Sequence, residues 1–339
     1  MKMGHVTVLI PTYNHGRVLA YQLESLLKQT FPPQSIIILD DGSVDETPEI
    51  LAKYQGNRTI KVIRQEQNLG LHAGLGVLLG QVDTEFFAFA AADDILARDW
   101  CVTTASLLEK YADAKMAISN TFIYEKGKVS VTDSINFPGR ESEGFCEPAQ
   151  YLESLMRYGL LPPTNTILYR SDIIGELIRP IMVRKELSSL IDVLLILAIA
   201  TKYPIAYSTK PTGVFIRSSE SYGNLFFGKD QLNSFITNIE LFSVRDGYLC
   251  NPAMMFVESW IRYTWGKQLI LSELAASRKD KKGLTYFLNS CFCYIRLLIL
   301  FFAYKRFKFI RFSKRRNHVQ GRDLKHFIDG SLFRRFDPA

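Results

Sequence analysis

Two adjacent carboxylates, Asp93 and Asp94, follow an apolar run at 86–92 that carries no charge. Such a run is typical of a buried central strand, so its last residues would leave the sheet at one edge. Hard divalent cations prefer oxygen ligands, and Mg²⁺ is commonly held by one or two carboxylates together with substrate phosphates. The pair therefore indicates a metal–phosphate site, although the same letters could equally form a turn at the end of a strand.

The segments around this pair alternate between strand-like and helix-like patterns. Short apolar, β-branched runs predict strands, and apolar residues at helical spacing predict the helices between them. This alternation predicts an α/β fold, with a mostly parallel central sheet flanked by helices. The expected strands are 6–10, 36–39, 60–64 and 86–92, and the expected helices are 18–30, 48–54 and 68–79.

Ligands of such sheets bind beyond the carboxyl ends of the strands. The polar loops 11–14 and 40–43 should therefore share one rim with Asp93 and Asp94. Later patterns predict a helix at 100–111, a strand at 116–124, a surface excursion at 125–147, a helix at 148–158, strands at 166–169 and 205–216, and an apolar helix at 188–201. From 226 onward the pattern is helical, which predicts a catalytic domain at 1–225 and a helical region at 226–339.

Four short motifs occur in sequence: Val8-Leu-Ile-Pro-Thr-Tyr-Asn14, Leu39-Asp-Asp-Gly-Ser-Val-Asp-Glu-Thr47, Asn68-Leu-Gly70 and Phe89-Ala-Ala-Ala-Asp-Asp94. In their order and spacing the chain resembles the family 2 nucleotide-sugar glycosyltransferases of the GT-A fold, of the bacterial surface-polysaccharide type. The resemblance covers roughly the first third of the chain. It implies a metal-dependent enzyme that moves a sugar from a nucleotide sugar, such as a UDP sugar, with inversion at the anomeric carbon.

The resemblance also implies roles for individual residues. Asp41 would meet the base, typically uracil, and Asp93 would lie near the ribose or the donor sugar. Asp94 would hold Mg²⁺ or Mn²⁺ between the two phosphates. The residues expected to line the nucleotide and donor pocket are Pro11, Thr12, Tyr13, Asn14, Asp40, Asp41, Gly42, Ser43, Asn68, Gly70 and Asp93.

The general base is the part of the expected site that the sequence indicates least clearly. Family members commonly place Glu-Asp at the start of a late helix, and here Leu190 stands where that aspartate is expected. Asp192 is the only acid within the apolar helix and is the expected base, with Glu186 as the alternative; Asp192 could also be a buried acid with a structural partner. In addition, Gly74-Leu75-Gly76 replaces the family's frequent Ala-Arg-Asn, so a basic contact to the diphosphate is missing from this position.

Three functions stay open at this point. The acceptor could be a hydroxyl group of a glycan or lipid-linked glycan, or it could be a polyprenyl phosphate, which needs little help from a base. The fold could also serve a non-catalytic protein that binds nucleotide sugars. A dinucleotide-dependent oxidoreductase is excluded, because the glycines at 74–80 follow the third strand instead of the first.

The net charge of +7 is concentrated near the C-terminus, where residues 281–339 hold fourteen Lys and Arg against three Asp. Residues 284–304 are long and apolar enough to span a bilayer, but cations flank both ends, so both ends prefer the cytoplasmic side. We therefore expect about 284–316 to lie on the anionic inner face of the cell membrane, peripheral to it. The long apolar stretch argues against nucleic acid as the partner, whereas packing on the catalytic domain or in a homo-oligomer remains an alternative.

The cysteines and the N-terminus fit the same location. Five cysteines without a paired spacing are typical of a reducing compartment. The first residues run directly into a strand pattern, and we expect no cleaved signal peptide.

Overall fold

The structure is a computed structural model that describes residues 5–216, except 126–127, 132–140, 159–161 and 186–190. The domain boundary expected near 225, the helical region at 226–339 and the apolar segment at 284–316 lie outside the described residues. Glu186, the alternative base, lies outside them as well. Within the described part of the chain, the helices are too short or too polar to cross a membrane.

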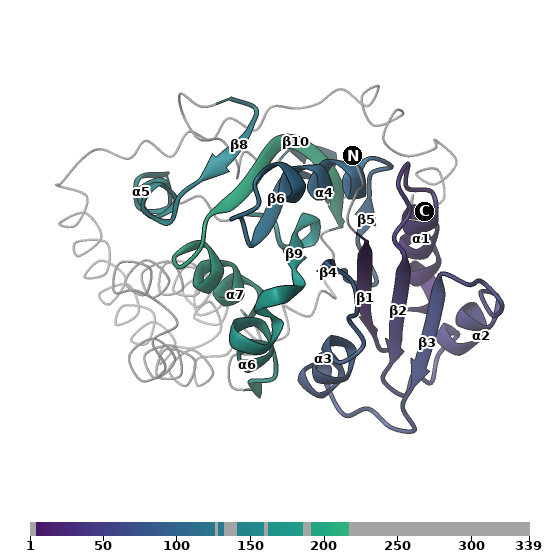
Figure 1. Cartoon of the computed structure of the whole chain (residues 1–339). Helices are drawn as coiled ribbons and strands as arrows, with labels where there is room; N and C mark the ends of the chain where they lie inside the picture. The colour runs from purple at the N-terminus through teal and green to yellow at the C-terminus, as the bar shows by residue number, and fades with distance from the viewer. Residues whose placement is uncertain (1–4, 126–127, 132–140, 159–161, 186–190, 217–339) are drawn as a thin grey trace, which may run out of the picture.

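A mixed sheet of ten strands organises the described residues, and Figure 1 shows helices packed around it. Its main path runs β3-β2-β1-β4-β9-β6-β10-β5, with β7 paired to β6 and β8 paired to β10. The strands are β1 (Val6–Thr12), β2 (Ser35–Asp40), β3 (Ile60–Arg64), β4 (Phe86–Phe89), β5 (Ile95–Leu96), β6 (Met116–Glu125), β7 (Lys128–Val131), β8 (Glu143–Cys146), β9 (Leu168–Arg170) and β10 (Ile205–Ile216).

The parallel arrangement expected from the sequence holds for one part of the sheet. Strands β3, β2, β1 and β4 are parallel neighbours, and β6 is parallel to β10. Strand β9 lies antiparallel between β4 and β6, and β5, β7 and β8 are also antiparallel to their partners. The expectation of a mostly parallel sheet is therefore corrected to a mixed sheet, because short return strands complete the half beyond β4.

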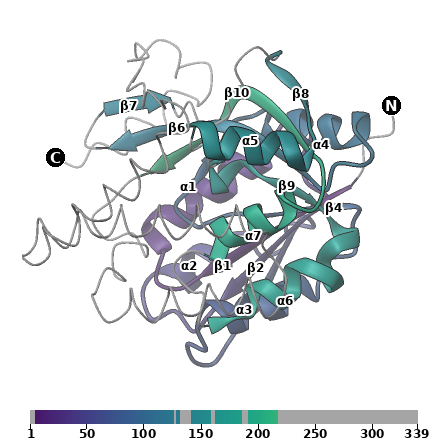
Figure 2. The ribbon, with the colours of Figure 1, turned by 90° about the vertical axis from the view of Figure 1, so that its left-hand side faces the viewer.

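Two layers of helices cover the sheet, and Figure 2 shows α3, α6 and α7 gathered on one side of it. The cluster that includes Leu9, Ile37 and Phe87 packs against α3, α5, α6 and α7, whereas the cluster that includes Val8, Ile36 and Phe86 packs against α1, α2 and α4. The α-helices are α1 (Gly16–Leu27), α2 (Thr47–Ala52), α3 (Leu71–Leu79), α4 (Trp100–Lys110), α5 (Pro148–Tyr158), α6 (Arg179–Met182) and α7 (Ile191–Ala200); η1 (Thr164–Thr166) and η2 (Ser171–Ile173) are 3-10 helices and η3 (Ile174–Ile178) is a π-helix.

Neighbouring residues of the central strands thus point to opposite faces, as the pleat of a strand requires. Because both faces are covered by helices, the strands read as continuous apolar runs instead of alternating ones. This explains why the sequence predicted their positions well. The observed strand order and parallel pairing place the carboxyl ends of β2, β1 and β4 side by side.

Two expectations about element boundaries are wrong. The strand expected at 86–92 ends at Phe89, because Ala90 makes one last bond to the carbonyl of Leu9 and the amide of Asp94 then bonds the carbonyl of Ala91 in a turn. The polar stretch at 125–147 was expected to be a surface excursion only. It contains β7 and β8, which pair with β6 and β10.

Candidate active site

The loops after β1 and β2 are locked together by hydrogen bonds between Asn14, Ser43 and Val44. The amide of Asn14 donates to Ser43 Oγ at 2.9 Å, and the amide of Val44 donates to Asn14 Oδ1 at 2.9 Å. Asn14 has a φ of 56°, in the left-handed region that asparagine tolerates better than most residues. Thr12 is buried at the end of β1, whereas the side chains of Tyr13 and Asn14 are exposed at the rim.

The N-terminus of α1 is closed by side chains from the next loop. The amide of Gly16 donates to Asp45 Oδ2 at 3.1 Å, the amide of His15 donates to Thr47 Oγ1, and Asp45 Oδ1 accepts the amide of Thr47. Burial acts to raise the pKa of Asp45, but hydrogen bonds from Thr47 and Gly16 outweigh it and lower the pKa. A carboxylate already neutralises this helix end, so it is not a phosphate cradle of the dinucleotide type.

Asp40 is fully buried and tied to Arg64. The Arg64 guanidinium donates from Nη1 to Asp40 Oδ2 at 3.0 Å and from Nη2 to the carbonyl of Ser43, while the amide of Ser43 donates to Asp40 Oδ1 at 2.9 Å. The carboxylate therefore holds the turn that follows β2. Gly42 in this turn has a φ of 75°, and a Cβ there would come within 2.8 Å of the backbone of Gln67.

Asp41 connects this turn to the start of α3. Its two carboxylate oxygens accept the amides of Leu69 and Gly70 at 2.9 and 2.8 Å. Asn68 Oδ1 also accepts the amide of Gly70, and Gly70 itself has a φ of 88°, which favours glycine. Each oxygen of Asp41 retains acceptor capacity for one more donor, which is compatible with a contact to the N–H of a base.

Asp94 lies in the turn after β4 and is 5% exposed, whereas Asp93 is only partly buried. Burial raises the pKa of Asp94 well above its usual range, and the neighbouring charges of Asp93 and Asp192 raise it further. Hydrogen bonds from the backbone of Ala91 and the side chain of Asn165 lower the pKa only in part. No described cation makes a salt bridge to Asp94, in contrast to Asp40.

Asp192 stands in the first turn of α7 and approaches this acidic pair from the opposite part of the sheet. The amide of Val193 donates to Asp192 Oδ1 at 2.8 Å, and the side chain of Thr164 supplies another hydrogen bond. Burial raises the pKa of Asp192 despite these hydrogen bonds. A raised pKa makes the Asp192 carboxylate a stronger base, which suits a group that accepts a proton during a reaction.

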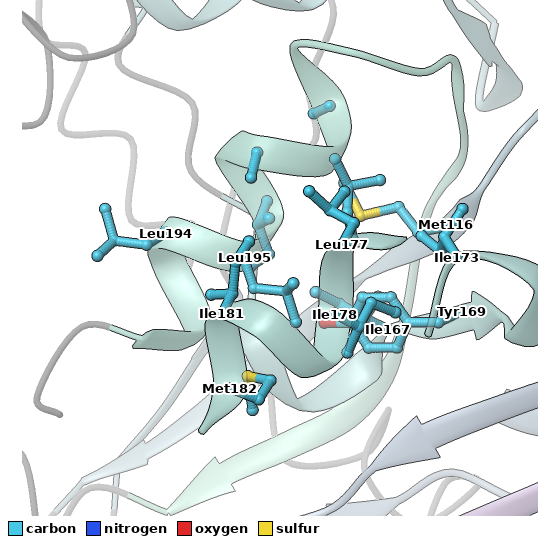
Figure 3. Close-up of a cluster of buried hydrophobic side chains, with 14 of the residues drawn as sticks. Met116, Ile167, Tyr169, Ile173, Leu177, Ile178, Ile181, Met182, Leu194 and Leu195 are labelled. Atoms are coloured by element: carbon cyan, nitrogen blue, oxygen red, sulfur yellow. The ribbon is translucent and has the colours of Figure 1, made fainter. Parts of the chain in front are cut away.

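A cluster of buried hydrophobic side chains packs α7 against the sheet. Figure 3 shows Leu194 and Leu195 of α7 in this cluster, together with residues of η3 and α6. Tyr169 of β9 lies in the same cluster and stacks on Phe87 with ring centroids 5.5 Å apart. Burial and the charge of Asp192 both raise the pKa of Tyr169, so its hydroxyl stays protonated. The hydrophobic core therefore positions the backbone of α7 against β9 and β4.

The comparisons with known proteins agree with this arrangement. Residues 7–165 match the family model described as glycosyl transferase family 2. This part of the chain, just under half of its length, is similar to a family 2 glycosyltransferase domain. The matched segment holds all four sequence motifs, and it ends at Asn165, beside Asp94.

Single relatives match over shorter parts. The poly(ribitol-phosphate) beta-N-acetylglucosaminyltransferase TarS of Staphylococcus aureus is 32% identical over 115 residues, which are 32% of this chain and 20% of TarS. The match thus spans about a fifth of that relative. A solved structure of S. aureus TarS 1–349 with UDP-GlcNAc has a TM-score of 0.59 at 18% identity, covering 86% of this chain and 81% of that one.

A second solved structure extends the likeness of fold. The mannosyltransferase PcManGT of Pyrobaculum calidifontis, in complex with GDP-Man and Mn²⁺, has a TM-score of 0.52 at 14% identity, covering 88% of this chain and 87% of that chain. At these identities the likeness establishes the fold. The GT-A-like fold expected from the four motifs is confirmed for the described residues.

One family feature is replaced in this glycosyltransferase domain. Leu75, which stands where many members have arginine, is 2% exposed and packs in the core with Leu39. The neighbouring Gly74 lets α3 approach the sheet closely, since a Cβ there would lie 3.0 Å from Leu39. This position of α3 therefore supplies packing instead of a basic contact to a diphosphate.

The donor atoms near the end of β4 fit a divalent cation that is shared with a substrate. Among the described residues, no group of three or more His, Cys, Asp or Glu side chains is placed to hold a metal ion. The site instead offers the carboxylates of Asp93 and Asp94, whose mutual repulsion a cation would relieve. One or two carboxylates completed by phosphate oxygens is the way Mg²⁺ is usually bound.

The structure brings most of the predicted residues to one rim, and it adds two that the sequence did not indicate. Asn165 and Thr164 contact Asp94 and Asp192, respectively. From the sequence, Pro162-Pro163-Thr164-Asn165 was only the segment before the strand expected at 166–169. Their contacts join segments far apart in the chain, and no local pattern marks them.

Proposed function

We propose that this chain is a metal-dependent, inverting glycosyltransferase that uses a nucleotide sugar, with a UDP sugar as the favoured donor. The observation that carries the proposal is Asp94, a buried carboxylate next to Asp93 with no cationic partner among the described residues and a raised pKa. Such a group is costly unless a ligand compensates it. Similarity to the family supports a glycosyl donor as that ligand.

Each side chain of the rim has a task in this proposal. Asp41, Asn14 and Ser43 shape the loops that receive the nucleotide, and Tyr13 offers an exposed ring beside them. Asp94, together with Asp93, would hold Mg²⁺ or Mn²⁺. When bound, the cation stabilises the negative charge of the departing nucleoside diphosphate.

Asp192 completes the reaction in this proposal. Its carboxylate takes the proton of the acceptor hydroxyl, whose oxygen attacks the anomeric carbon as the sugar–phosphate bond breaks. A single displacement of this kind inverts the anomeric configuration. The UDP-GlcNAc bound to TarS and the GDP-Man and Mn²⁺ bound to PcManGT are consistent with this type of donor and cation.

The test is thermal stabilisation by a panel of UDP, GDP and other nucleotide sugars, with Mn²⁺ or Mg²⁺, followed by assays of sugar release. Ligands that bind the folded state raise the melting temperature in proportion to affinity and concentration. We expect the true donor to stabilise the wild type only with the cation, and Asp94→Asn to lose this effect. Stabilisation without turnover would instead favour a non-catalytic nucleotide-sugar-binding protein.

A second assay distinguishes the two acceptor classes. Asp192→Asn should abolish transfer to a hydroxyl acceptor, because the amide cannot take the proton. Transfer to a polyprenyl phosphate should survive this substitution, because that oxygen is already ionised. Equal activity of Asp192→Asn and wild type on every hydroxyl acceptor would remove Asp192 from the mechanism.

We also propose that the acceptor is a lipid-linked glycan and that the enzyme works at the cytoplasmic face of the cell membrane. The support is the sequence alone, in which cations and aromatic residues alternate beyond Tyr304. Flotation with anionic and neutral vesicles tests it, using the full chain and a variant with Lys305, Arg306, Lys308 and Arg311 changed to Gln. We expect binding to anionic vesicles only, weakened by salt and by the substitutions; equal flotation with neutral vesicles contradicts the electrostatic part.

A further inference from the structure

We propose that the short helix η1 is the positioning element of the site, with Asn165 orienting Asp94 and Thr164 orienting Asp192. This inference rests on the proposed function. It adds the element that holds Asp94 and Asp192 at a fixed position relative to each other. Asp94 follows β4 and Asp192 opens α7, and both receive a hydrogen bond from adjacent residues of η1. One rigid turn therefore contacts the cation-binding acid and the base at once.

Asn165 is built into the site as a buried donor. It is 5% exposed, its Nδ2 donates to Thr121 Oγ1 of β6 at 3.3 Å, and its side chain also bonds Asp94. The bond to Thr121 anchors the Asn165 side chain on β6, and the same side chain bonds Asp94. The Oδ1 atom of Asn165 is buried and has no hydrogen-bond partner among the described residues, which leaves an acceptor for a ligand.

The rest of η1 is anchored so that it cannot shift easily. Thr166 Oγ1 donates to the carbonyl of Ser119 at 2.5 Å, and Trp100 Nε1 donates to the carbonyl of Thr166 at 3.2 Å. Gly213 of β10 lies directly against the turn, since a Cβ there would come within 2.6 Å of Thr166 Cγ2 and 3.3 Å of Asn165 Nδ2. The strand β10 thus approaches η1 as closely as a glycine permits.

This anchoring distinguishes η1 from the other contacts of the two acids. Among the described residues, the remaining hydrogen bonds to Asp94 and Asp192 come from their own neighbours in sequence, Ala91 and Val193. Such local bonds fix a carboxylate relative to its own turn only. The bonds from η1 are the ones that fix both carboxylates relative to β6 and β10, and hence to each other.

The first experiment measures Mn²⁺ binding without turnover, by the spectrum of free Mn²⁺ in the presence of UDP. Asn165→Leu removes the donor at nearly the same size, and we expect Mn²⁺ affinity to fall by at least about tenfold, as for other residues that orient a metal ligand. Asn165→Ser serves the same purpose if the leucine variant does not fold. Thr104→Val removes a buried hydroxyl of α4 that bonds its own helix, and this control should leave Mn²⁺ affinity unchanged.

The outcomes separate the inference from the function on which it rests. If the wild type binds Mn²⁺ and both folded Asn165 variants bind it within twofold of wild type, η1 does not position Asp94. If the wild type itself binds no divalent cation with or without UDP, the proposed metal-dependent function fails and the inference fails with it. Weakened binding in the Asn165 variants but not in Thr104→Val supports the inference.

The second experiment tests the other end of η1. Thr164→Val removes the hydroxyl that bonds Asp192 and keeps the shape of the side chain. We expect kcat to fall by about tenfold or more, with the KM for the donor and the Mn²⁺ affinity unchanged, because the base and not the donor site loses its orientation. Thr164→Ser should restore kcat. An unchanged kcat, or a parallel loss of Mn²⁺ affinity, contradicts the separate roles of Thr164 and Asn165.

Discussion

Two pairs of adjacent aspartates lie at the carboxyl ends of two strands of the same mixed sheet, and their surroundings are opposite. Asp40 ends β2 and Asp41 follows it, and their carboxylates accept hydrogen bonds from the guanidinium of Arg64 and from backbone amides. Asp93 and Asp94 follow β4, where burial and like charges raise the pKa of Asp94. The residue types are the same, but among the described residues only the first pair has a cationic partner.

This difference separates architecture from chemistry. The first pair stabilises the loops that shape the nucleotide pocket, and Asp41 does so by joining β2 to the start of α3. The second pair carries negative charge that no described cationic side chain balances. A bound cation would therefore have its most favourable electrostatic interaction here. A buried carboxylate without compensation is more often a functional site than a structural one, although ion networks also perturb such groups.

The largest expected effect tests the second pair. Asp94→Asn should lower glycosyl transfer by at least about 10²-fold, the usual effect of losing one group that stabilises transition-state charge. It should not lower the melting temperature of the metal-free protein, because an uncompensated buried charge is removed. Transfer assays and thermal melts on the same samples measure both. Near-wild-type activity, or a large loss of stability, would make Asp94 a structural residue like Asp40.

The next effect tests the first pair. Arg64→Met removes the cation from Asp40, which is fully buried, and should turn this carboxylate into an uncompensated one. Because Arg64 is half-exposed, water replaces part of the interaction, and we expect a loss of about 2 kcal/mol in the free energy of unfolding. Urea denaturation measures it. If the variant is as stable as the wild type, the two pairs do not differ in the way proposed.

The sequence predicted the first pair and its surroundings well, because these are local features. Apolar runs end at proline, glycine and aspartate in the loops after β1 and β2, and the strand order of an α/β unit then brings these loops together. Thr12, Asn14 and Asp41 were predicted on the rim and are found there. Asp45 belongs to the same motif, and its carboxylate accepts the amides of Gly16 and Thr47 at the starts of α1 and α2.

The sequence was less informative around the second pair. Alanines follow Phe89 without any pattern that marks where β4 ends, so the expected strand was too long. The environment of Asp94 depends on Asn165 and Asp192, which reach it through β9, η1 and α7, and these contacts are long-range. Pairing of β9 between β4 and β6 is decided by packing across the sheet, which no local pattern of residues records.

A smaller effect concerns Asp45, which joins the starts of α1 and α2 beside the first pair. Asp45→Ala removes the acceptor for the amides of Gly16 and Thr47, and loss of such a capping side chain costs about 1 kcal/mol. The pKa of Asp45 is lowered from its ordinary 3.8, so its contribution is present above that pH and is lost as the pH falls through the folded value. Urea denaturation at pH 7 and near pH 3 should show the difference between variant and wild type shrinking in acid. A difference that stays constant or grows in acid would mean that the charged form is not what clamps the helices.

The smallest effect sets the baseline for the first pair. Lys28 and Glu24 form a salt bridge on α1 at 3.2 Å with both side chains more than 40% exposed, whereas the Asp40 carboxylate facing Arg64 is fully buried. Lys28→Met should therefore change the free energy of unfolding by no more than about 0.5 kcal/mol, and this change should vanish in high salt. Urea denaturation of Lys28→Met and Arg64→Met side by side makes the comparison. Both variants lose one cation and gain the same apolar side chain, so a larger loss in Arg64→Met measures the burial of Asp40 together with the lost bond from Arg64 Nη2 to the carbonyl of Ser43. Equal losses would mean that burial does not decide the strength of these pairs, and the contrast between Asp40 and Asp94 would then need another cause.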